Sequence, residues 1–575
     1  MYRIWSLWIG LLSLAAANAQ TTVIARVMDA QQGHPLPYAT VLLMGTSRGT
    51  ITNSEGWFGL PLQGVDDSLR ISFIGYKTLV IPFTAALDGT HILLERAVHE
   101  LAEAVVRPGE DLYARVVAAS KWLRRAPEIE AKLFYGLETH SDEQPVELMH
   151  AYFSVTLKAA MITGLDFKRG KIGIAPKDDK HFINFNTARA FALLDVHARQ
   201  SRFPLSPLAH TSRKALKQEF LVELIEAAVD HDGVDHLRAT PRDPSQGAFT
   251  MDLWLAKGSA QVRAFELACT SCPRHPFIPL FPEGRIDSVD MRYRQTWTTE
   301  PPYLPQVMEL AYNTAYTGPD MSDHFQSHAI MHAFDHGAPF IPTQFHWPDL
   351  LEEYRKIFWL PEDTIFWSRM TPPLPTEKQL KDHAFIAAHD LRNNAWYGEL
   401  TEHNDLLRPV FIAWSPEDRL TYEDITGAWV RTAHGPPDPD RIQLYTRLYL
   451  EMDTAKGDLH WFSCAVFGPH RSVYLAKPLP WTDAFINIYF DLCEMERRKM
   501  EASLREPGMT VGKAVKIHTH HSRELNNRLD MYMKHTRNGS DRDALKPWDE
   551  LVVKELGIAN LPRVIQPVEQ SQEHR

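Results

Sequence analysis

The sequence predicts a multi-domain α+β protein, with an N-terminal β-sandwich, a sheet-rich middle region and a C-terminal α+β domain. The chain has 575 residues, and single hydrophobic cores rarely grow beyond about 250–300 residues. Its first part alternates apolar and polar side chains between turn residues, and its last part carries apolar residues at helical spacing. We expect these segments: a signal peptide at 1–19, a β-sandwich at 20–108, a β-rich middle domain at 109–344, a helical connector at 345–405, a C-terminal domain at 406–562 and a tail at 563–575.

The composition is that of an ordinary folded protein. Hydrophobic residues make up 44% of the chain and charged residues 23%, which is typical of globular domains. The net charge of −11 is spread over the whole length, and no dense block of Lys and Arg is present to neutralise phosphates. We therefore expect no nucleic-acid partner.

The first residues have the pattern of an export signal. Arg3 supplies a positive charge, an apolar run extends from Ile4 to Ala17, and Ala17-Asn18-Ala19 is a small-x-small cleavage site before Gln20. The run is shorter than the roughly 20 apolar residues that span a bilayer, and no later stretch reaches that length. We expect an exported protein of the periplasm, outer membrane or cell surface, without a transmembrane segment in the mature chain. An uncleaved N-terminal anchor is the alternative.

The strands expected between residues 21 and 107 carry three motifs in a fixed order. They are Pro37-x-Ala39-x-Val41, Gly49-Thr50-x-Thr52-Asn53-x-Glu55-Gly56-x-Phe58 and Ser72-Phe73-Ile74-Gly75-Tyr76. This segment resembles the carboxypeptidase-regulatory-like domain found at the N-terminus of many bacterial envelope proteins. The resemblance implies a transthyretin-like β-sandwich that binds or acts as a spacer and has no peptidase residues.

The middle region combines one clear helix with many strands. Leu112 to Arg125 has helical spacing, several later stretches alternate like strands, and the stretch 214–230 fits both periods. Between residues 345 and 400 helical spacing returns, interrupted by a Pro-rich segment.

Four cysteines are too few to form the framework of so large a chain. They are Cys269, Cys272, Cys464 and Cys493. Cys269 and Cys272 have the spacing of a redox motif, but Pro273 follows at once and the usual strand-to-helix context is missing. A local disulfide or two thiols is the expected state, and the pairing of the four stays open.

Histidines recur every four residues near the end of the middle region. His324, His328, His332 and His336 would lie on one side of either a helix or a strand, and three imidazoles, helped by Asp335, could bind zinc. Zinc ligands normally converge from two elements, however, so a solvated or stacked row of side chains is the alternative. A second group has the same two interpretations: His518, His520 and His521.

The C-terminal region begins with the signature Trp414-Ser415-x-x-Asp418-x-Leu420-Thr421-x-x-Asp424-x-x-Gly427. Two alternating strands follow, and then a helix from Asp483 to Leu504 with Thr482 at the N-cap. The run resembles an exported bacterial family related to zinc-dependent peptidases. In that family the helix carries H-E-x-x-H, in which two histidines grip zinc and the glutamate is the general base.

The resemblance implies a zincin-like domain that has lost its catalytic residues. Phe485 and Tyr489 stand at the two histidine positions, Ile486 at the position of the base, and Asn538 at that of the third ligand. Phe and Ile cannot ligate zinc or accept a proton, and no H-E-x-x-H occurs anywhere in the chain. The alternative is a plain amphipathic core helix, and both interpretations predict a helix that packs and does not hydrolyse.

Two functions follow from these observations. The first is a non-catalytic, exported cell-envelope protein without a cofactor, in which a regulatory-like module and an inactive peptidase-like domain bind another envelope component, a peptide or a glycan. The second is a metal-dependent hydrolase or peptidase of the envelope that uses His324, His328 and His332.

Overall fold

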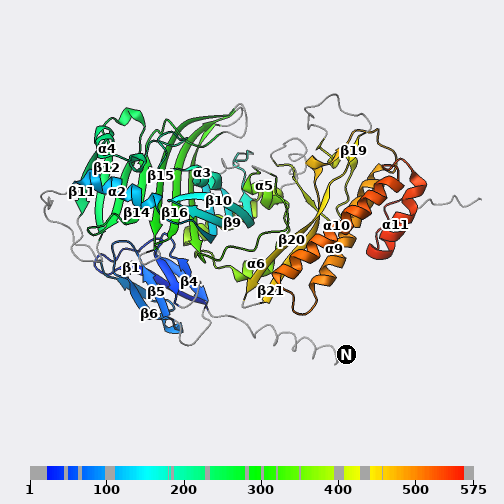
Figure 1. Ribbon diagram of the computed structural model, residues 1–575, viewed down its shortest axis with the longest axis horizontal. Coiled ribbons are helices and arrows are strands. Elements are labelled where there is room, and N and C mark those ends of the chain that lie inside the picture. Colours follow the sequence, from blue (N-terminus) through cyan, green and yellow to red (C-terminus); the bar gives the residue numbers. More distant parts are fainter. Residues whose placement is uncertain are drawn as a thin grey trace, which may run out of the picture. The chain divides into compact units, whose positions relative to one another are not determined.

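A computed structural model describes residues 22–44, 49–61, 68–96, 111–178, 180–182, 187–226, 234–278, 284–298, 303–318, 322–348, 351–393, 407–427, 441–455 and 458–561 (Figure 1). The predicted signal peptide and C-terminal tail lie outside these residues. The chain divides into two compact units. Unit 1 comprises Met1–Phe340 and Met370–Tyr397, and unit 2 comprises Ile341–Arg369 and Gly398–Arg575. The expected connector at 345–405 is thus shared between the units.

The N-terminal domain consists of two small sheets around one apolar core. One sheet has the order β4-β1-β7 and the other β3-β2-β5-β6. Alternate residues of β1, namely Val23, Ala25 and Val27, are fully buried, as expected for half-buried strands. The predicted β-sandwich-like domain is therefore confirmed. Its elements are β1 (Thr22–Asp29), β2 (Thr40–Leu43), β3 (Gly49–Ile51), β4 (Trp57–Pro61), β5 (Ser68–Ser72), β6 (Leu79–Pro82), η1 (Ala85–Leu87) and β7 (His91–Leu94).

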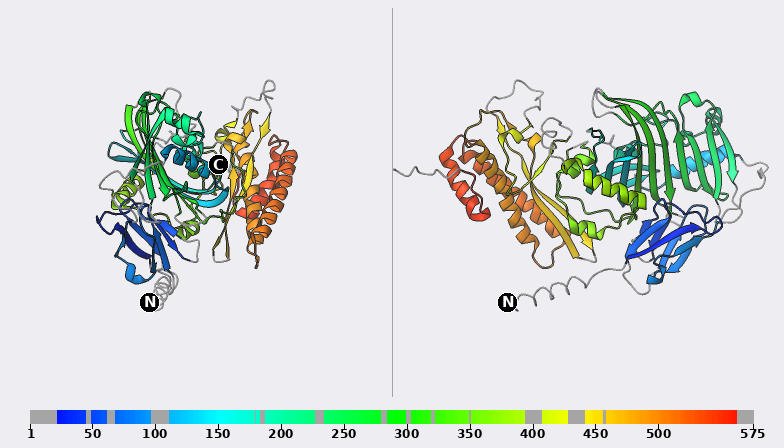
Figure 2. Two further views of the ribbon diagram at one scale, coloured as in Figure 1. Left: turned by 60° about the vertical axis from the view of Figure 1, so that its left-hand side comes forward. Right: turned by 180° about the vertical axis from the view of Figure 1, so that it is seen from behind.

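The middle region forms a ten-stranded antiparallel sheet, coloured cyan to green in Figures 1 and 2. Its order is β10-β9-β8-β17-β16-β15-β14-β13-β12-β11, so the first strand of the region pairs with the last. The strands are β8 (Ile129–Ser141), β9 (Gln144–Lys158), β10 (Met161–Ile174), β11 (Phe220–Glu226), β12 (Val234–Pro241), β13 (Thr250–Ala256), β14 (Val262–Cys269), β15 (Arg285–Trp297), β16 (Pro305–Thr317) and β17 (Ser322–Phe334).

One face of this sheet is apolar and is covered by helices. The row Leu267, Tyr293, Leu310, Ala329 and Leu137 crosses it and is buried. Helix α2, capped by the Asp111 side chain, packs against β11 and β14, and α3 packs against β10. Helix α7 packs on β9 and β10 from the other face of the sheet, where Gln379 donates to Glu138. The helices are α2 (Leu112–Arg124), α3 (Thr187–Leu193), η2 (Pro207–Ala209), α4 (Arg213–Glu219), η3 (Pro244–Gln246), α7 (Glu377–His389) and η4 (Leu391–Asn393).

The ambiguous stretch at 214–230 contains both kinds of structure. Helix α4 ends at Glu219, and β11 begins at the next residue, Phe220. The helical and the strand-like periodicity of the sequence therefore both occur in the structure, one after the other.

Unit 2 packs long helices on a twisted β-hairpin (Figure 2). The hairpin β20–β21 carries the short strand β18 at its side, and α9 contacts β20, β21, α10 and α11. The predicted N-cap is wrong by one position, because Thr482 is already the first residue of α9 and Trp481 precedes it without a side-chain cap. The elements are α5 (Glu353–Phe358), α6 (Thr364–Arg369), β18 (Ile412–Ala413), η5 (Tyr422–Asp424), β19 (Ile442–Gln443), β20 (Thr446–Ala455), β21 (Asp458–Phe467), η7 (Pro469–Arg471), β22 (Val473–Tyr474), α9 (Thr482–Leu504), α10 (Val511–His535) and α11 (Arg542–Leu556).

Within the described part of the chain, none of the helices combines the length and the apolar character needed to cross a bilayer.

Candidate functional site

The positions predicted to be emptied zinc ligands lie on α9 and just after α10. Phe485 and Ile486 are fully buried and Tyr489 nearly so. The rings of Phe485 and Tyr489 both contact Tyr532 of α10, with centroid distances of 5.4 and 6.2 Å. Asn538 is exposed. The structure therefore brings Phe485 and Tyr489 together at Tyr532, whereas the side chain of Asn538 is exposed.

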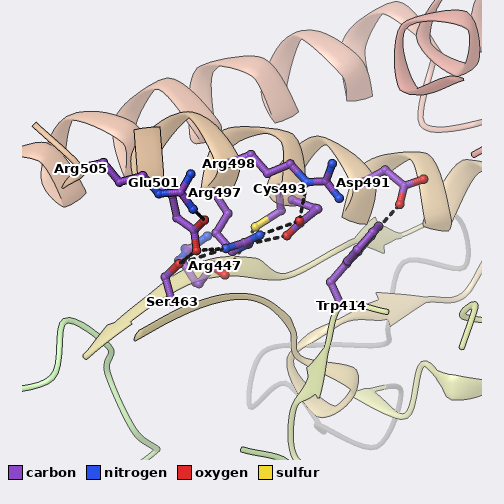
Figure 3. A network of polar contacts seen from close by, with 10 residues as sticks. Trp414, Arg447, Ser463, Asp491, Cys493, Arg497, Arg498, Glu501 and Arg505 are labelled. Atoms are coloured by element: carbon purple, nitrogen blue, oxygen red, sulfur yellow. Dashed lines mark hydrogen bonds and ion pairs between the residues drawn. The ribbon is translucent and has the colours of Figure 1, made fainter. Parts of the chain in front are cut away.

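The opposite face of α9 carries a self-neutralising set of charges (Figure 3). Glu494 accepts hydrogen bonds from Nε of Arg497 (2.6 Å) and of Arg498 (2.8 Å). Arg497 also pairs with Glu501, which accepts a hydrogen bond from the Ser463 hydroxyl of β21 (3.0 Å). The two carboxylates balance the two guanidinium groups. Because the Ser463 hydroxyl of β21 joins the network, it links α9 to the hairpin.

The signature that begins at Trp414 also fastens α9. Trp414 Nε1 and Arg419 Nη2 donate to the fully buried carboxylate of Asp491, at 2.8 and 2.7 Å. The backbone N–H of Leu420 donates to Asn487 Oδ1 (2.9 Å). A buried carboxylate needs such partners, because an unpaired charge in the interior is costly. These residues therefore have a structural role.

Three histidines of the ladder, His324, His328 and His332, lie on one strand, β17, and do not converge. Side chains four residues apart on a strand are separated by about 13 Å, too far to share one ion. His324 is exposed, His328 is half-buried and bonds Glu309 (2.9 Å), and His332 is buried. His336 donates to the Pro305 carbonyl (2.9 Å). The alternative of a solvated or stacked row describes them better than a zinc site.

The second histidine group is likewise dispersed along α10. His518 donates to the Leu448 carbonyl (3.2 Å), His521 pairs with Glu496 (2.7 Å), and His520 is exposed. Among the residues that the structure describes, no three His, Cys, Asp or Glu side chains are placed to hold a metal ion.

The cysteine pairing is local. Cys269 and Cys272 form a disulfide at the end of β14. Burial raises the pKa of the Cys493 thiol on α9 to about 12, so this side chain stays protonated.

A polar row crosses the second face of the ten-stranded sheet. Cross-strand partners lie side by side on one face, and consecutive partners form a line from β14 to β9. That line is Glu266, Arg294, Glu309, Ile330, Gly136 and His150. The line beside it is Arg292, Ala311, His328 and Glu138. We call this side of the sheet the polar face.

The N-terminal domain and α7 lie over the polar face and enclose two cavities. The first cavity has Arg294, Trp297 and Glu309 on its sheet side and the motif residues Ser72 and Phe73 on its domain side. Close by, the Thr40 hydroxyl donates to Gln306 Oε1 (2.7 Å) and ties the domain to the sheet.

The second cavity lies on the other side of Tyr38. Its sheet side is formed by Glu138, His150 and His328, and α7 contributes Gln379 and His383. Gly136 lines its floor, where an added Cβ would lie 3.3–3.4 Å from Phe134 and Ile330. The glycine therefore keeps the floor of this cavity open.

Tyr38 lines both cavities and has an unusual backbone. Its φ of 59° lies in the left-handed region, which is rare for a bulky residue and marks sites worth attention. The motif residue Thr52 holds this conformation, because its hydroxyl donates to the Leu36 carbonyl (2.6 Å) and accepts from the Ala39 N–H (2.8 Å). The Tyr38 ring stacks on His328 with a centroid distance of 6.3 Å.

In the second cavity, burial and neighbouring charges shift pKa values in opposite directions. Burial would lower the pKa of His328, but the hydrogen bond and charge of Glu309 outweigh it and raise the pKa. Burial likewise opposes ionisation of Glu138, yet the His383 and Gln379 side chains keep its pKa below the ordinary value. Burial lowers the pKa of His150 to about 4, so this imidazole is neutral at physiological pH. Of these two imidazoles, His150 is neutral and His328 has a raised pKa.

Three buried donors around these cavities make no hydrogen bond to any described residue. They are Nε of Arg294 in the first cavity and, in the second, Nδ2 of Asn53 and Nε2 of His383. The nearest carboxylate oxygen to His383, Oε1 of Glu138, lies 3.9 Å away. Buried donors without partners are rare in folded proteins and indicate a site that a ligand or water completes.

Only some residues that line the two cavities were singled out in the sequence. The motifs included Ser72, Phe73 and Asn53, and the histidine ladder included His328, but each was considered separately. Arg294 and Glu138 stand in strands that look ordinary in the sequence. Only the pairing of strands brings them together.

Two of the solved structures that match cover about two fifths of the chain each. The MucA/MucB complex of Pseudomonas aeruginosa is 8% identical, covers 39% of this chain and 94% of that one, and has a TM-score of 0.13. A LolA superfamily protein of Nitrosomonas europaea is 11% identical, covers 40% of this chain and 96% of that one, and has a TM-score of 0.17. With scores this low, neither likeness supports an argument about fold or function. A search of curated proteins found no significant match.

A family model gives a result for the N-terminal domain. Residues 26–106 match the family described as CarboxypepD_reg-like domain. The three motifs used to identify the resemblance lie inside this range. The predicted N-terminal carboxypeptidase-regulatory-like domain is confirmed.

Proposed function

We propose that the chain is a non-catalytic binding protein of the bacterial cell envelope, whose ligand, a peptide or a glycan of another envelope component, occupies the cavities between the N-terminal domain and the polar face. The observation that carries this proposal is the arrangement at Tyr38. A tyrosine in the left-handed region, held by a motif threonine, lines two cavities that contain buried donors without a hydrogen-bond partner among the described residues.

The donors define what such a ligand must offer. Asn53 Nδ2 and His383 Nε2 both need acceptors, which peptide carbonyls and sugar hydroxyls supply. The rings of Tyr38 and Phe134 give flat apolar surfaces beside them. Pockets that combine apolar walls with a few convergent polar groups are the usual form of small-ligand sites.

Export to the periplasm or cell surface belongs to the same proposal. It is supported by the apolar run and small-x-small site at the N-terminus and by the domain type that follows them. The descent of residues 406–562 from a zinc peptidase stays a sequence-based prediction, and binding at the cavities does not depend on it.

Binding of the full chain to a library of short peptides and to a glycan array tests the proposal. The Tyr38→Ala variant should bind the tightest wild-type ligand at least tenfold more weakly than the wild type does, because the substitution removes a ring that lines both cavities. Val80→Ala is the matched control, since Val80 is 52% exposed on β6 of the same domain. Circular dichroism checks that both variants are folded.

Two results would contradict the proposal. One is a wild-type chain that binds members of neither collection, or that binds equally well after Tyr38→Ala. The other is turnover of a bound ligand that depends on an added metal ion, which would favour the hydrolase instead.

A further inference from the structure

Helix α7 is attached to the polar face by very little apolar surface. It belongs to the segment Met370–Tyr397 of unit 1, whereas the residues before and after this segment in the sequence belong to unit 2. Of its 13 residues only Ile386 is buried, and this side chain lies on Gly173 of β10, where an added Cβ would come within 2.4 Å of Ile386 Cγ2. A helix with one buried side chain gains little free energy from apolar burial, so its polar contacts decide whether it stays docked.

Those polar contacts involve titratable side chains. His140 of β8 lies 3.0 Å from the Asp382 carboxylate and accepts from Lys378 Nζ at 2.9 Å. Gln379 donates to Glu138 Oε1 at 2.6 Å. The strength of docking therefore depends on pH.

The contact between α7 and β9 brings two imidazoles together. The rings of His150 on β9 and His383 on α7 meet edge to face, with centroids 5.4 Å apart. Burial opposes a proton on His150 most strongly, and the charges of His383 and of the cross-strand neighbour Lys171 oppose it further, whereas Glu138 favours it. Tyr38 lines the same cavity, and burial raises the pKa of its hydroxyl, so that it adds no charge. His150 is therefore neutral while α7 is docked.

Protonation of His150 would leave one positive charge at this contact unbalanced. Three imidazoles line the second cavity, and two of them face a carboxylate: His328 lies 2.9 Å from Glu309, and His383 lies 3.9 Å from Glu138. Among the described residues, no carboxylate forms an ion pair with the third imidazole, His150. Movement of α7 away from the sheet would relieve both the burial of the new charge and its repulsion from His383.

We infer that α7 is a pH-sensitive strap, which lies closed on the polar face at neutral pH and leaves it when acid protonates His150. Opening uncovers His150 and Glu138 at the second cavity. The helix can move as a unit, because a capping box of Thr376 and Gln379 holds its first turn without help from the sheet. The inference goes beyond the proposed function, because it concerns the movement of α7 and holds with or without a ligand.

The pKa of His150 gives the size of the effect. It is about 4 while α7 is docked and returns towards 6.5 when the ring is exposed to water. The contribution of this histidine to docking is fully present above about pH 6.5 and is lost as the pH falls towards 4. Between pH 7 and pH 5 the equilibrium constant for docking should fall roughly twentyfold.

Hydrogen exchange of the full chain at pH 7 and pH 5, followed by mass spectrometry and corrected for intrinsic exchange rates, tests the inference. In the wild type, peptides from α7 should lose protection roughly twentyfold at pH 5, while peptides from β14 of the same unit stay protected over the same labelling times. His150→Phe and His150→Gln should keep α7 protected at pH 5, because neither new side chain takes up a proton there. His389→Gln is the matched control and should lose protection like the wild type, since His389 is exposed on α7 and bonds the Phe385 carbonyl of its own helix.

A variant beneath α7 reports the open strap at neutral pH. Gly173→Ala should lower the protection of α7 already at pH 7, because the added Cβ displaces Ile386. Its α7 peptides give the exchange rate of the released helix without any change of pH.

Three results would overturn the inference. The first is equal protection of α7 at pH 7 and pH 5 in the wild type. The second is an acid-induced loss that persists in both His150 variants, which would assign the loss to other groups. The third is exchange of α7 together with β14 at pH 5, since the whole sheet would then have unfolded. None of these results bears on the proposed function, which ligand binding tests separately.

Discussion

Replacing His332 by leucine should make the first unit more resistant to acid. His332 is 4% exposed on β17 and has Val307 and Phe134 as its cross-strand neighbours. Burial, with a contribution from His336, lowers its pKa to about 3. In the unfolded chain the imidazole titrates near pH 6.5, so the unfolded state binds the proton first as the pH falls.

The direction and size follow from this difference. A histidine with a lowered folded-state pKa contributes stability that is fully present above about pH 6.5 and is lost as the pH falls towards 3. Between pH 7 and pH 5 the loss from His332 is about 2 kcal/mol in the free energy of unfolding. His332→Leu removes this loss and leaves the other titrating groups unchanged.

Denaturant titrations at pH 7 and pH 5 measure the effect. Hydrogen exchange in β17 peptides, followed by mass spectrometry, reports the unit that contains His332. The wild type should lose about 2 kcal/mol more on acidification than His332→Leu. His324→Leu serves as the control and should behave like the wild type, because His324 is exposed on the same strand.

Equal losses in wild type and His332→Leu would refute the reasoning. A second result would also refute it: a chelator that lowers the stability of the wild type at pH 7 but not that of His332→Leu. That result would mean that His332 holds a metal ion, as the alternative function requires.

Two further predictions concern unit 2. Gly539→Ala should destabilise it by about 2–4 kcal/mol, because Gly539 has a φ of 82° and a Cβ there would lie 2.7 Å from the Phe485 ring. Gly557→Ala should cost about 1 kcal/mol, since Gly557 has similar backbone angles but open space around it. Asp491→Ala should cost about 3–5 kcal/mol by leaving buried donors without their acceptor, whereas Asp543→Ala, at an exposed helix end, should unfold close to the wild-type temperature. Thermal unfolding with tryptophan fluorescence measures all four. Equal effects within either pair would contradict the packing described.

Much of the secondary structure was predictable, because buried positions recur with the period of the helix or strand and apolar residues repeat in the sequence at that spacing. The N-terminal strands alternate clearly, and the helices beginning at Leu112 and Thr482 were found within a residue or two. The ladder from His324 to His332 could not be assigned in this way, because a spacing of four puts side chains on one side of both a helix and a strand.

The cavities could not be predicted, because they depend on which strands pair. Glu138 and His328 are cross-strand partners although many strands come between them in the sequence. Tyr38 gave no signal of its own, since only the backbone angle distinguishes it from any tyrosine in a turn. The exposure of Asn538 was not predictable for a similar reason: a resemblance in the frame residues does not determine which side chain of a turn faces inward.

The pairing of β8 with β17 has a consequence for how the molecule is made. Strand β8 is synthesised early but pairs with β17, the last strand of its sheet. One edge of β8 therefore stays unpaired while β9 to β16 are synthesised. Contacts of such long sequence separation form slowly, and open edges invite association with other chains. The edge of β8 is therefore open to association with other chains until β17 has been made.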